Sequence, residues 1–176
     1  MKLELRHLAA YLPYKLKILR PDNETVLQLT GLNGNLLIFL EDYTEKYGHI
    51  RKNKPILRPL SDLTKKIEIN GKEFIPLGKI LTENFSNVIN INFGCSNYGY
   101  YAQGEKIAPK SIIRISYSDI DGFILSKMPN DHVKPSDYFR KTGNQDWMFE
   151  KLFEWHFDVF GLIDAGLAID INSLND

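Results

Sequence analysis

Residues 67–75 read IEINGKEFI, and this stretch carries the clearest structural signal in the chain. Asn-Gly tolerates the positive φ angles of a two-residue type I′ turn, which joins twisted antiparallel strands. The residues on either side of Asn70 and Gly71 suit strands. The stretch therefore predicts a β-hairpin, and residues 76–83 directly after it predict a short helix.

Further strands are expected on both sides of this hairpin. Residues 88–93 alternate polar and apolar side chains, as a half-buried strand does, and residues 111–117 predict another strand. Towards the N-terminus, a Pro-Asp-Asn turn beginning at Pro21 separates two apolar runs and predicts a second hairpin. The run LLIFL at residues 36–40 predicts a buried strand or a short helix.

Helices are expected at four further places. Their predicted ranges are residues 5–12, a start at 59–64, a short helix beginning at 138–140, and the longest candidate at 144–158. In the longest one, polar residues form one stripe and apolar residues the opposite one. A closing strand is expected at residues 167–171, and loops are expected at residues 41–55 and 94–104.

These elements predict an α+β fold: a small, mostly antiparallel sheet built from hairpins, with several short helices and one longer C-terminal helix. The chain has 176 residues, of which 43% are hydrophobic and 25% are charged, so it can bury a sizeable core. No repeat or long linker interrupts the pattern. We expect a single domain spanning residues 1–176.

Charge and cysteine content narrow the possible partners. Lys and Arg total 22, as do Asp and Glu, so the basic excess typical of duplex-binding proteins is missing and a nucleic acid is a less favoured partner. Cys95 is the only cysteine, which excludes an internal disulfide framework and a multi-cysteine zinc site. The N-terminus lacks the pattern of a signal peptide, and no window is apolar enough for a membrane span. We expect a cytoplasmic protein with no membrane partner and no cofactor.

The segment Glu154, Trp155, His156, Phe157 and Asp158 is a first candidate site. As a strand it would align Glu154, His156 and Asp158 on one face as a possible metal trio. As a helix it turns His156 about 200° away from Glu154, towards the apolar side. The surrounding apolar stripe favours the helix, so the favoured interpretation is a core histidine with solvated carboxylates, and no metal is predicted.

The aromatic segment around Tyr98, Tyr100 and Tyr101 is a second candidate site, because its tyrosines lie in a glycine-containing segment expected to be a loop. Tyrosine offers rigid contact area with a polar tip, which suits base stacking or packing on a protein. A loop without any ligand would have the same composition. If the segment binds a partner, the three rings should be exposed and close together.

Two charged segments are further candidates. The basic run at residues 49–54, with Arg58 nearby, could meet phosphates, although the acidic residues just before it favour a solvated loop. The Asp119–Gly122 stretch resembles the start of a calcium loop, but the twelfth position is Asn130 rather than the required Glu. None of the common nucleotide-binding, metalloprotease or hydrolase motifs is present.

Three stretches of the chain resemble a group of small proteins encoded by tailed bacteriophages and prophages of Bacteroidetes-type bacteria. The stretches are residues 1–14, 55–65 and 154–172, so the similarity spans both ends and the middle. No activity or catalytic residue is assigned to this group. The resemblance implies a setting, which is a phage-encoded protein acting in the cytoplasm of a bacterial host.

Two functional hypotheses follow. The first is a phage-encoded, non-enzymatic accessory protein that binds a host or phage macromolecule, with a protein as the favoured partner. The second is a small-ligand-binding protein or enzyme with a pocket built from Arg58, Asp62, His156 and Asp158, because Arg forks onto carboxylate or phosphate and His titrates near neutral pH. Whether the chain is an enzyme stays open, and no oligomeric state is predicted.

Overall fold

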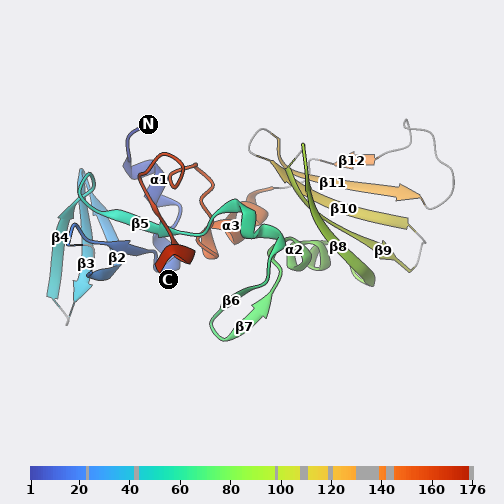
Figure 1. Cartoon of the computed structure of the whole chain (residues 1–176), viewed down its shortest axis with the longest axis horizontal. Coiled ribbons are helices and arrows are strands. Elements are labelled where there is room, and N and C mark those ends of the chain that lie inside the picture. Colours follow the sequence, from blue (N-terminus) through green and yellow to red (C-terminus); the bar gives the residue numbers. More distant parts are fainter. Residues whose placement is uncertain are drawn as a thin grey trace. The chain divides into compact units, whose positions relative to one another are not determined.

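The computed structural model describes residues 1–22, 24–41, 44–97, 99–107, 111–118, 121–129, 139–141 and 145–174. It is a mixed α+β structure, built mostly from strands in antiparallel sheets (Figure 1). The chain divides into two compact units. The terminal unit combines Met1–Leu60 with Phe149–Asp176, and the central unit is Ser61–Met148.

The terminal unit contains a six-stranded sheet with the order β13-β5-β1-β2-β3-β4. Neighbouring strands run antiparallel, apart from the parallel pair of β13 and β5. The elements are α1 (Leu5–Ala9), a 3-10 helix (Leu12–Tyr14), β1 (Lys17–Leu19), β2 (Val26–Asn33), β3 (Leu36–Glu41), β4 (Thr44–His49), β5 (Lys54–Leu57), β13 (Ile169–Asp170) and a 3-10 helix (Ile171–Leu174).

The core of the terminal unit lies against one face of this sheet. Strands β2 and β3 alternate buried and exposed side chains, and Leu29 pairs with Phe39 on the buried face. Segments from both chain ends cover that face, since Tyr11 and Leu162 belong to the same buried cluster. The Tyr11 hydroxyl donates a 2.6 Å hydrogen bond to the backbone oxygen of Phe157, which ties the two ends together.

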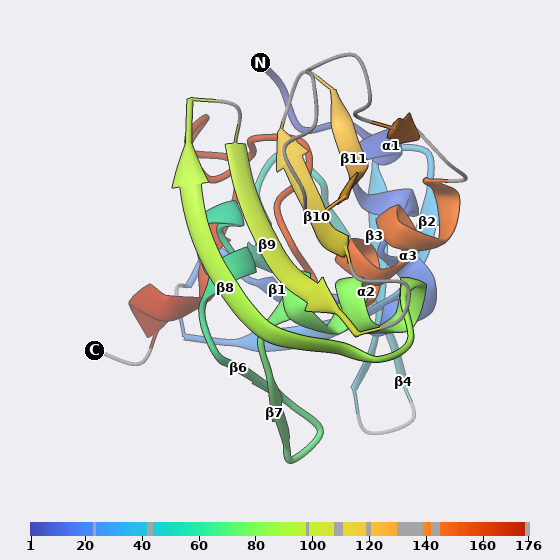
Figure 2. The same cartoon turned by 90° about the vertical axis from the view of Figure 1, so that its right-hand side faces the viewer.

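The central unit contains a five-stranded sheet with the order β12-β11-β10-β9-β8, in which every neighbour is also a neighbour in sequence (Figure 2). Its elements are β6 (Ile67–Ile69), β7 (Lys72–Phe74), α2 (Pro76–Asn84), β8 (Val88–Ser96), β9 (Gly99–Lys106), β10 (Ser111–Ser118), β11 (Gly122–Pro129) and β12 (Phe139–Lys141). A 3-10 helix (Leu60–Thr64) spans the boundary at which the chain enters this unit, and α3 (Asp146–Glu154) spans the boundary at which it returns to the terminal unit.

Helix α2 packs against one face of the five-stranded sheet and starts with Pro76, whose fixed φ angle suits a first helical position. The helix approaches β8 closely at Gly78, because a Cβ atom there would lie 2.9 Å from Cζ of Phe93. Strand β10 places Ile113 and Ile115 on the buried face, while alternate residues point to the opposite, outer face. The outer face therefore carries half-buried, largely polar side chains.

The expected long C-terminal helix is wrong in its length, because α3 ends at Glu154 rather than at Asp158 and is no longer than α2. His156 adopts φ +58° and ends the helix. The amide of His156 bonds to Phe153 O at 3.0 Å, and the amide of Phe157 bonds to Leu152 O at 2.8 Å. This pair of bonds is a Schellman motif, which normally has glycine where His156 stands.

Several expected elements are confirmed: the hairpin β6–β7, helix α2, the hairpin β1–β2, and strands β3, β8 and β10. Both expected loops are wrong. Residues 41–55 contain β4 and the start of β5, and residues 94–104 lie mostly in the β8–β9 hairpin. Tyr138 lies outside the described residues, but Phe139 and Arg140 belong to strand β12 rather than to a helix. The closing strand is reduced to the two residues of β13.

Among the described helices, none has the length and apolar character required to cross a lipid bilayer.

Candidate functional site

Three of the residues proposed for a ligand pocket, Arg58, His156 and Asp158, meet in the terminal unit through their backbones. The Arg58 amide donates a 2.8 Å hydrogen bond to His156 O, and the Asp158 amide donates a 2.8 Å bond to Arg58 O. This is a short parallel bridge in which Arg58 pairs with Phe157. The three residues are therefore neighbours, but backbone pairing explains their proximity.

The carboxylate of Asp158 is buried and accepts backbone hydrogen bonds from the turn that follows it. Oδ1 accepts a hydrogen bond from the Leu162 amide at 2.8 Å, and Oδ2 accepts one from the Ile163 amide at 2.7 Å. Asp158 is 4% exposed and Leu162 is fully buried, so water could not replace the carboxylate at the Leu162 amide. Asp158 thus holds the chain reversal that brings the C-terminal segment onto the core.

The imidazole of His156 is also engaged by backbone. Its Nε2 lies 2.8 Å from the carbonyl oxygen of Tyr14, so this nitrogen carries the proton and donates it. Burial lowers the pKa of His156, and the positive charges of Arg58 and Lys17 lower it further, while the hydrogen bond to Tyr14 opposes the shift. The neutral ring is the favoured form, and it joins the N-terminal segment to the end of α3.

Asp62 belongs to the central unit, where its carboxylate lies 2.9 Å from the ammonium group of Lys65. Glu154, the remaining member of the possible metal trio, pairs with Lys151 at 2.7 Å. Across the described residues, no group of three or more His, Cys, Asp or Glu side chains is arranged to hold a metal ion. Both carboxylate oxygens of Asp158 and Nε2 of His156 are thus bound to backbone partners instead of a common ligand.

Of the aromatic candidates, Tyr100 and Tyr101 lie in β9, and Tyr98 lies outside the described residues. Tyr100 and Tyr101 are consecutive in β9, so their side chains point to opposite faces of the sheet, and both are half-buried. These two residues do not form the expected exposed cluster. The ring of Tyr101 lies across Gly94, where a Cβ atom would come within 2.5 Å of its hydroxyl oxygen, and Arg114 covers it at 3.9 Å from the ring centroid.

The terminal unit also carries an apolar surface that was not predicted from the sequence, and we call it the β3 face. It is the outer face of β2, β3 and β4; its apolar side chains are Val26, Leu36, Ile38, Leu40 and Tyr47, and Gln28, Glu45 and His49 share it. Four of these side chains are strongly exposed: Val26 at 43%, Leu36 at 40%, Leu40 at 52% and Tyr47 at 54%. The signal was present in the uninterrupted run at residues 36–40, because a strand with one solvated face should alternate apolar and polar side chains.

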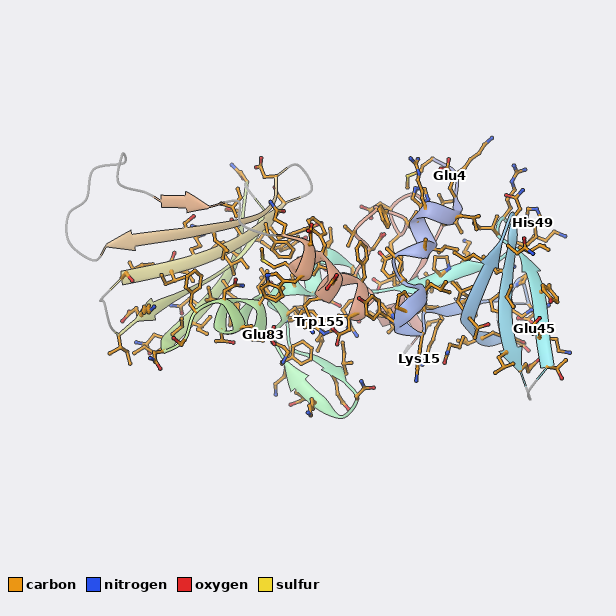
Figure 3. All side chains as sticks on the ribbon, turned by 180° about the vertical axis from the view of Figure 1, so that it is seen from behind. Glu4, Lys15, Glu45, His49, Glu83 and Trp155 are labelled. Carbon is orange, nitrogen blue, oxygen red and sulfur yellow. The ribbon has the colours of Figure 1, made fainter. Side chains whose placement is uncertain are left out.

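The β3 face ends at strand β4, which has a single neighbour, β3, among the described strands. The amide of Ile50 donates a 2.9 Å hydrogen bond to Asn35 O, so these two residues form a hydrogen-bonded pair of the antiparallel ladder. Glu45, Tyr47 and His49 belong to the alternate, non-hydrogen-bonded pairs, and their backbone N–H and C=O groups therefore point away from β3. Figure 3 labels Glu45 and His49 at the two ends of this strand. The hydroxyl of Tyr47 donates a 2.6 Å bond to the Glu45 carboxylate, and this bond raises the pKa of Tyr47.

Comparisons with known proteins return no relatives for this chain. No family model matches it, and no curated protein or solved structure matches it either.

Proposed function

We propose that this chain is a phage-encoded, non-enzymatic accessory protein that binds a host or phage protein in the bacterial cytoplasm, and that the β3 face is its binding surface. The observation that carries the proposal is the exposure of Leu36, Leu40 and Tyr47 on one sheet face, where Ile38 lies between the two leucines and pairs with Tyr47. Isolated apolar side chains are normal on protein surfaces, but a contiguous set on one sheet face is typical of an interaction site.

The composition of the β3 face suits a protein partner. Its centre is aliphatic, and its edge carries Tyr47, one of the residue types that contribute most to binding when buried in an interface. Polar side chains adjoin this apolar set in β4, where Glu45 pairs with Leu40 and His49 pairs with Leu36. Burying apolar surface contributes roughly 25 cal/mol per Å², so a partner that covers these side chains gains affinity mainly from their removal from water.

The alternative function, a small-ligand-binding protein or enzyme built around Arg58, Asp62, His156 and Asp158, has less support. Both carboxylate oxygens of Asp158 and Nε2 of His156 already hold backbone partners within the fold. Substituting His156 or Asp158 is therefore expected to lower the stability of the fold. A nucleic acid remains the less favoured macromolecular partner because the chain has no net charge.

The test is affinity purification from infected cells, followed by calorimetry with the purified partner. Leu40→Ser and Tyr47→Ser are compared with Ile107→Ser, a matched control, because Ile107 is a 62% exposed apolar residue of the central unit. We expect each β3-face variant to weaken binding about tenfold, since truncating a central interface side chain costs more than roughly 1 kcal/mol. Unchanged binding by both variants, or an equal loss with Ile107→Ser, would overturn the proposal.

A further inference from the structure

Strand β4 forms an open edge of the terminal unit's sheet. It pairs with β3 on one side and, within the described part of the chain, with no strand on the other (Figure 1). The strand is six residues long, and all of them are exposed apart from Gly48, which is half-buried. An uncovered edge of this length is a template to which another strand can add.

The backbone groups that an added strand would use belong to Glu45, Tyr47 and His49. Their N–H groups, and the carbonyl groups of Glu45 and Tyr47, have no hydrogen-bond partner among the described residues. The His49 carbonyl is already used, because it accepts from the Lys52 amide at 2.9 Å and from Asn53 Nδ2 at 2.8 Å. The open ladder therefore runs from Glu45 to the amide of His49.

The charges along β4 select one way of pairing two copies of this strand. In an antiparallel pair about a two-fold axis, the register is defined by the residue at the axis, which lies nearest its own counterpart. An axis at Glu45 would oppose two carboxylates, and an axis at Lys46 would oppose two ammonium groups, both of which are destabilising. An axis at Gly48 or beyond would shift Glu45 past the end of the other strand, because β4 ends at His49. An axis at Tyr47 avoids both problems.

We propose that a second copy of this chain pairs with β4, antiparallel, about a two-fold axis at Tyr47. The two Tyr47 residues exchange N–H···O bonds, and each His49 amide donates to the Glu45 carbonyl of the other copy. The same register places each Glu45 carboxylate opposite the other copy's imidazole. Nδ1 of His49 accepts from the Arg51 amide at 3.2 Å, so the neutral ring carries its proton on Nε2 and can donate it to that carboxylate.

The remaining side chains of β4 are compatible with this register. Charges on an edge strand discourage pairing with an unrelated strand, but here Lys46 lies opposite Gly48 of the other copy and meets no like charge. On the β3 face, the two Tyr47 rings form a cross-strand aromatic pair, and each also pairs with Ile38 of its own copy. The axis is perpendicular to the sheet, so both β3 faces lie on the same side and remain open to a protein partner. The dimer therefore does not depend on the proposed function.

The pairing is tested by sedimentation velocity of the full chain at concentrations from about 1 to 500 µM, where we expect a reversible dimer with a Kd of roughly 10–100 µM. Glu45→Lys and His49→Glu each place like charges opposite one another, and each should weaken dimerisation about tenfold. An equimolar mixture of these two variants restores opposite charges in every cross-strand pair, so heterodimers should form with about the wild-type affinity. Glu68→Lys is the control, because Glu68 is an exposed strand glutamate of the central unit.

The register is tested by disulfide trapping in a Cys95→Ser background, since Cys95 is the only native cysteine and is exposed. Tyr47→Cys places two thiols at the axis, where the Cα separation of about 5.5 Å suits a disulfide. Lys46→Cys places them about 7–8 Å apart on the diagonal, and should form cross-linked dimers about tenfold more slowly. A wild type that stays monomeric at every concentration, a mixture no more dimeric than its components, an equal loss with Glu68→Lys, or equal trapping of the two cysteine variants would overturn the proposal.

Discussion

In both units, chain segments cover one face of a mostly antiparallel sheet. The two units differ in where these segments come from in the sequence. The central unit is continuous in sequence, and its strands β8 to β12 pair in the order in which they are made. The terminal unit closes only when Phe157 meets Tyr11, 146 residues earlier. Such a contact requires a long loop to close before it contributes, so local patterns in the sequence carry little information about it.

The largest effect should come from removing one buried ring in each unit. Phe157 and Phe123 are both 0% exposed, and truncating a buried phenylalanine to alanine costs about 3–5 kcal/mol. In urea unfolding followed by hydrogen exchange, Phe157→Ala should speed exchange at both chain ends, whereas Phe123→Ala should speed it in β9 to β11. If both variants accelerate exchange equally throughout the chain, the units unfold together and the comparison fails.

A glycine in each unit's hairpins gives the next contrast. Gly99 (φ +96°) and Gly34 (φ +56°) both adopt backbone angles that L side chains rarely adopt, but only at Gly99 would a Cβ atom overlap the Tyr117 carbonyl oxygen. Gly34→Ala should cost about 1–2 kcal/mol for the backbone alone. Gly99→Ala should add about 1–3 kcal/mol for the overlap, measured as the difference in unfolding free energy. Equal costs would mean that β9 can shift away from β10.

Two other glycines, Gly94 and Gly104, explain why the β8–β9 hairpin was not predicted. Gly94 and Gly104 indicate a loop in the sequence, yet both lie in strands, where Tyr101 and Val88 pack against their bare backbones. A glycine that admits a neighbouring ring and a glycine that makes a turn have the same letter, and only the folded contacts distinguish them. The β6–β7 hairpin could be predicted because its Asn-Gly turn depends on no distant partner.

Strand β4 and the end of α3 were missed for related reasons. The charged residues Glu45 and Lys46 suggest a solvated loop, but charges are common on edge strands, where they discourage pairing with other chains. His156 occupies a left-handed position that usually holds glycine, held there by its bond to Tyr14. For the candidate site, the sequence suggested a ligand pocket built from Arg58, Asp62, His156 and Asp158, of which Arg58, His156 and Asp158 lie together through backbone pairing. Their structural roles follow from contacts with distant backbone that no local pattern encodes.

A smaller effect should follow from neutralising the carboxylate that closes the terminal unit. Asp158→Asn keeps the shape of the side chain but leaves one of the Leu162 and Ile163 amides without an acceptor, so we expect a loss of about 1–3 kcal/mol. Asp164→Asn is the control, since Asp164 is exposed in the same segment. Urea midpoints measure both. If the two variants behave alike, the chain reversal does not depend on Asp158 and the terminal unit is closed mainly by its apolar core.

The smallest effect should be the pH dependence of the contact between His156 and Tyr14, which joins the two ends of the chain. Because burial lowers the pKa of His156 below its unfolded value of about 6.5, the unfolded chain binds a proton more readily than the folded one. The contribution of the neutral ring is therefore fully present above about pH 6.5, and it decreases as the pH falls towards the lowered folded pKa. Urea midpoints measured from pH 7.5 to 5 should fall more for the wild type than for His156→Asn, which tolerates the left-handed backbone but does not titrate. Hydrogen exchange at low pH should place the loss in the terminal unit. Parallel midpoint curves for the two proteins would show that the imidazole accepts its proton without disturbing the bond to Tyr14, and that the junction between the chain ends is not the pH-sensitive part of the molecule.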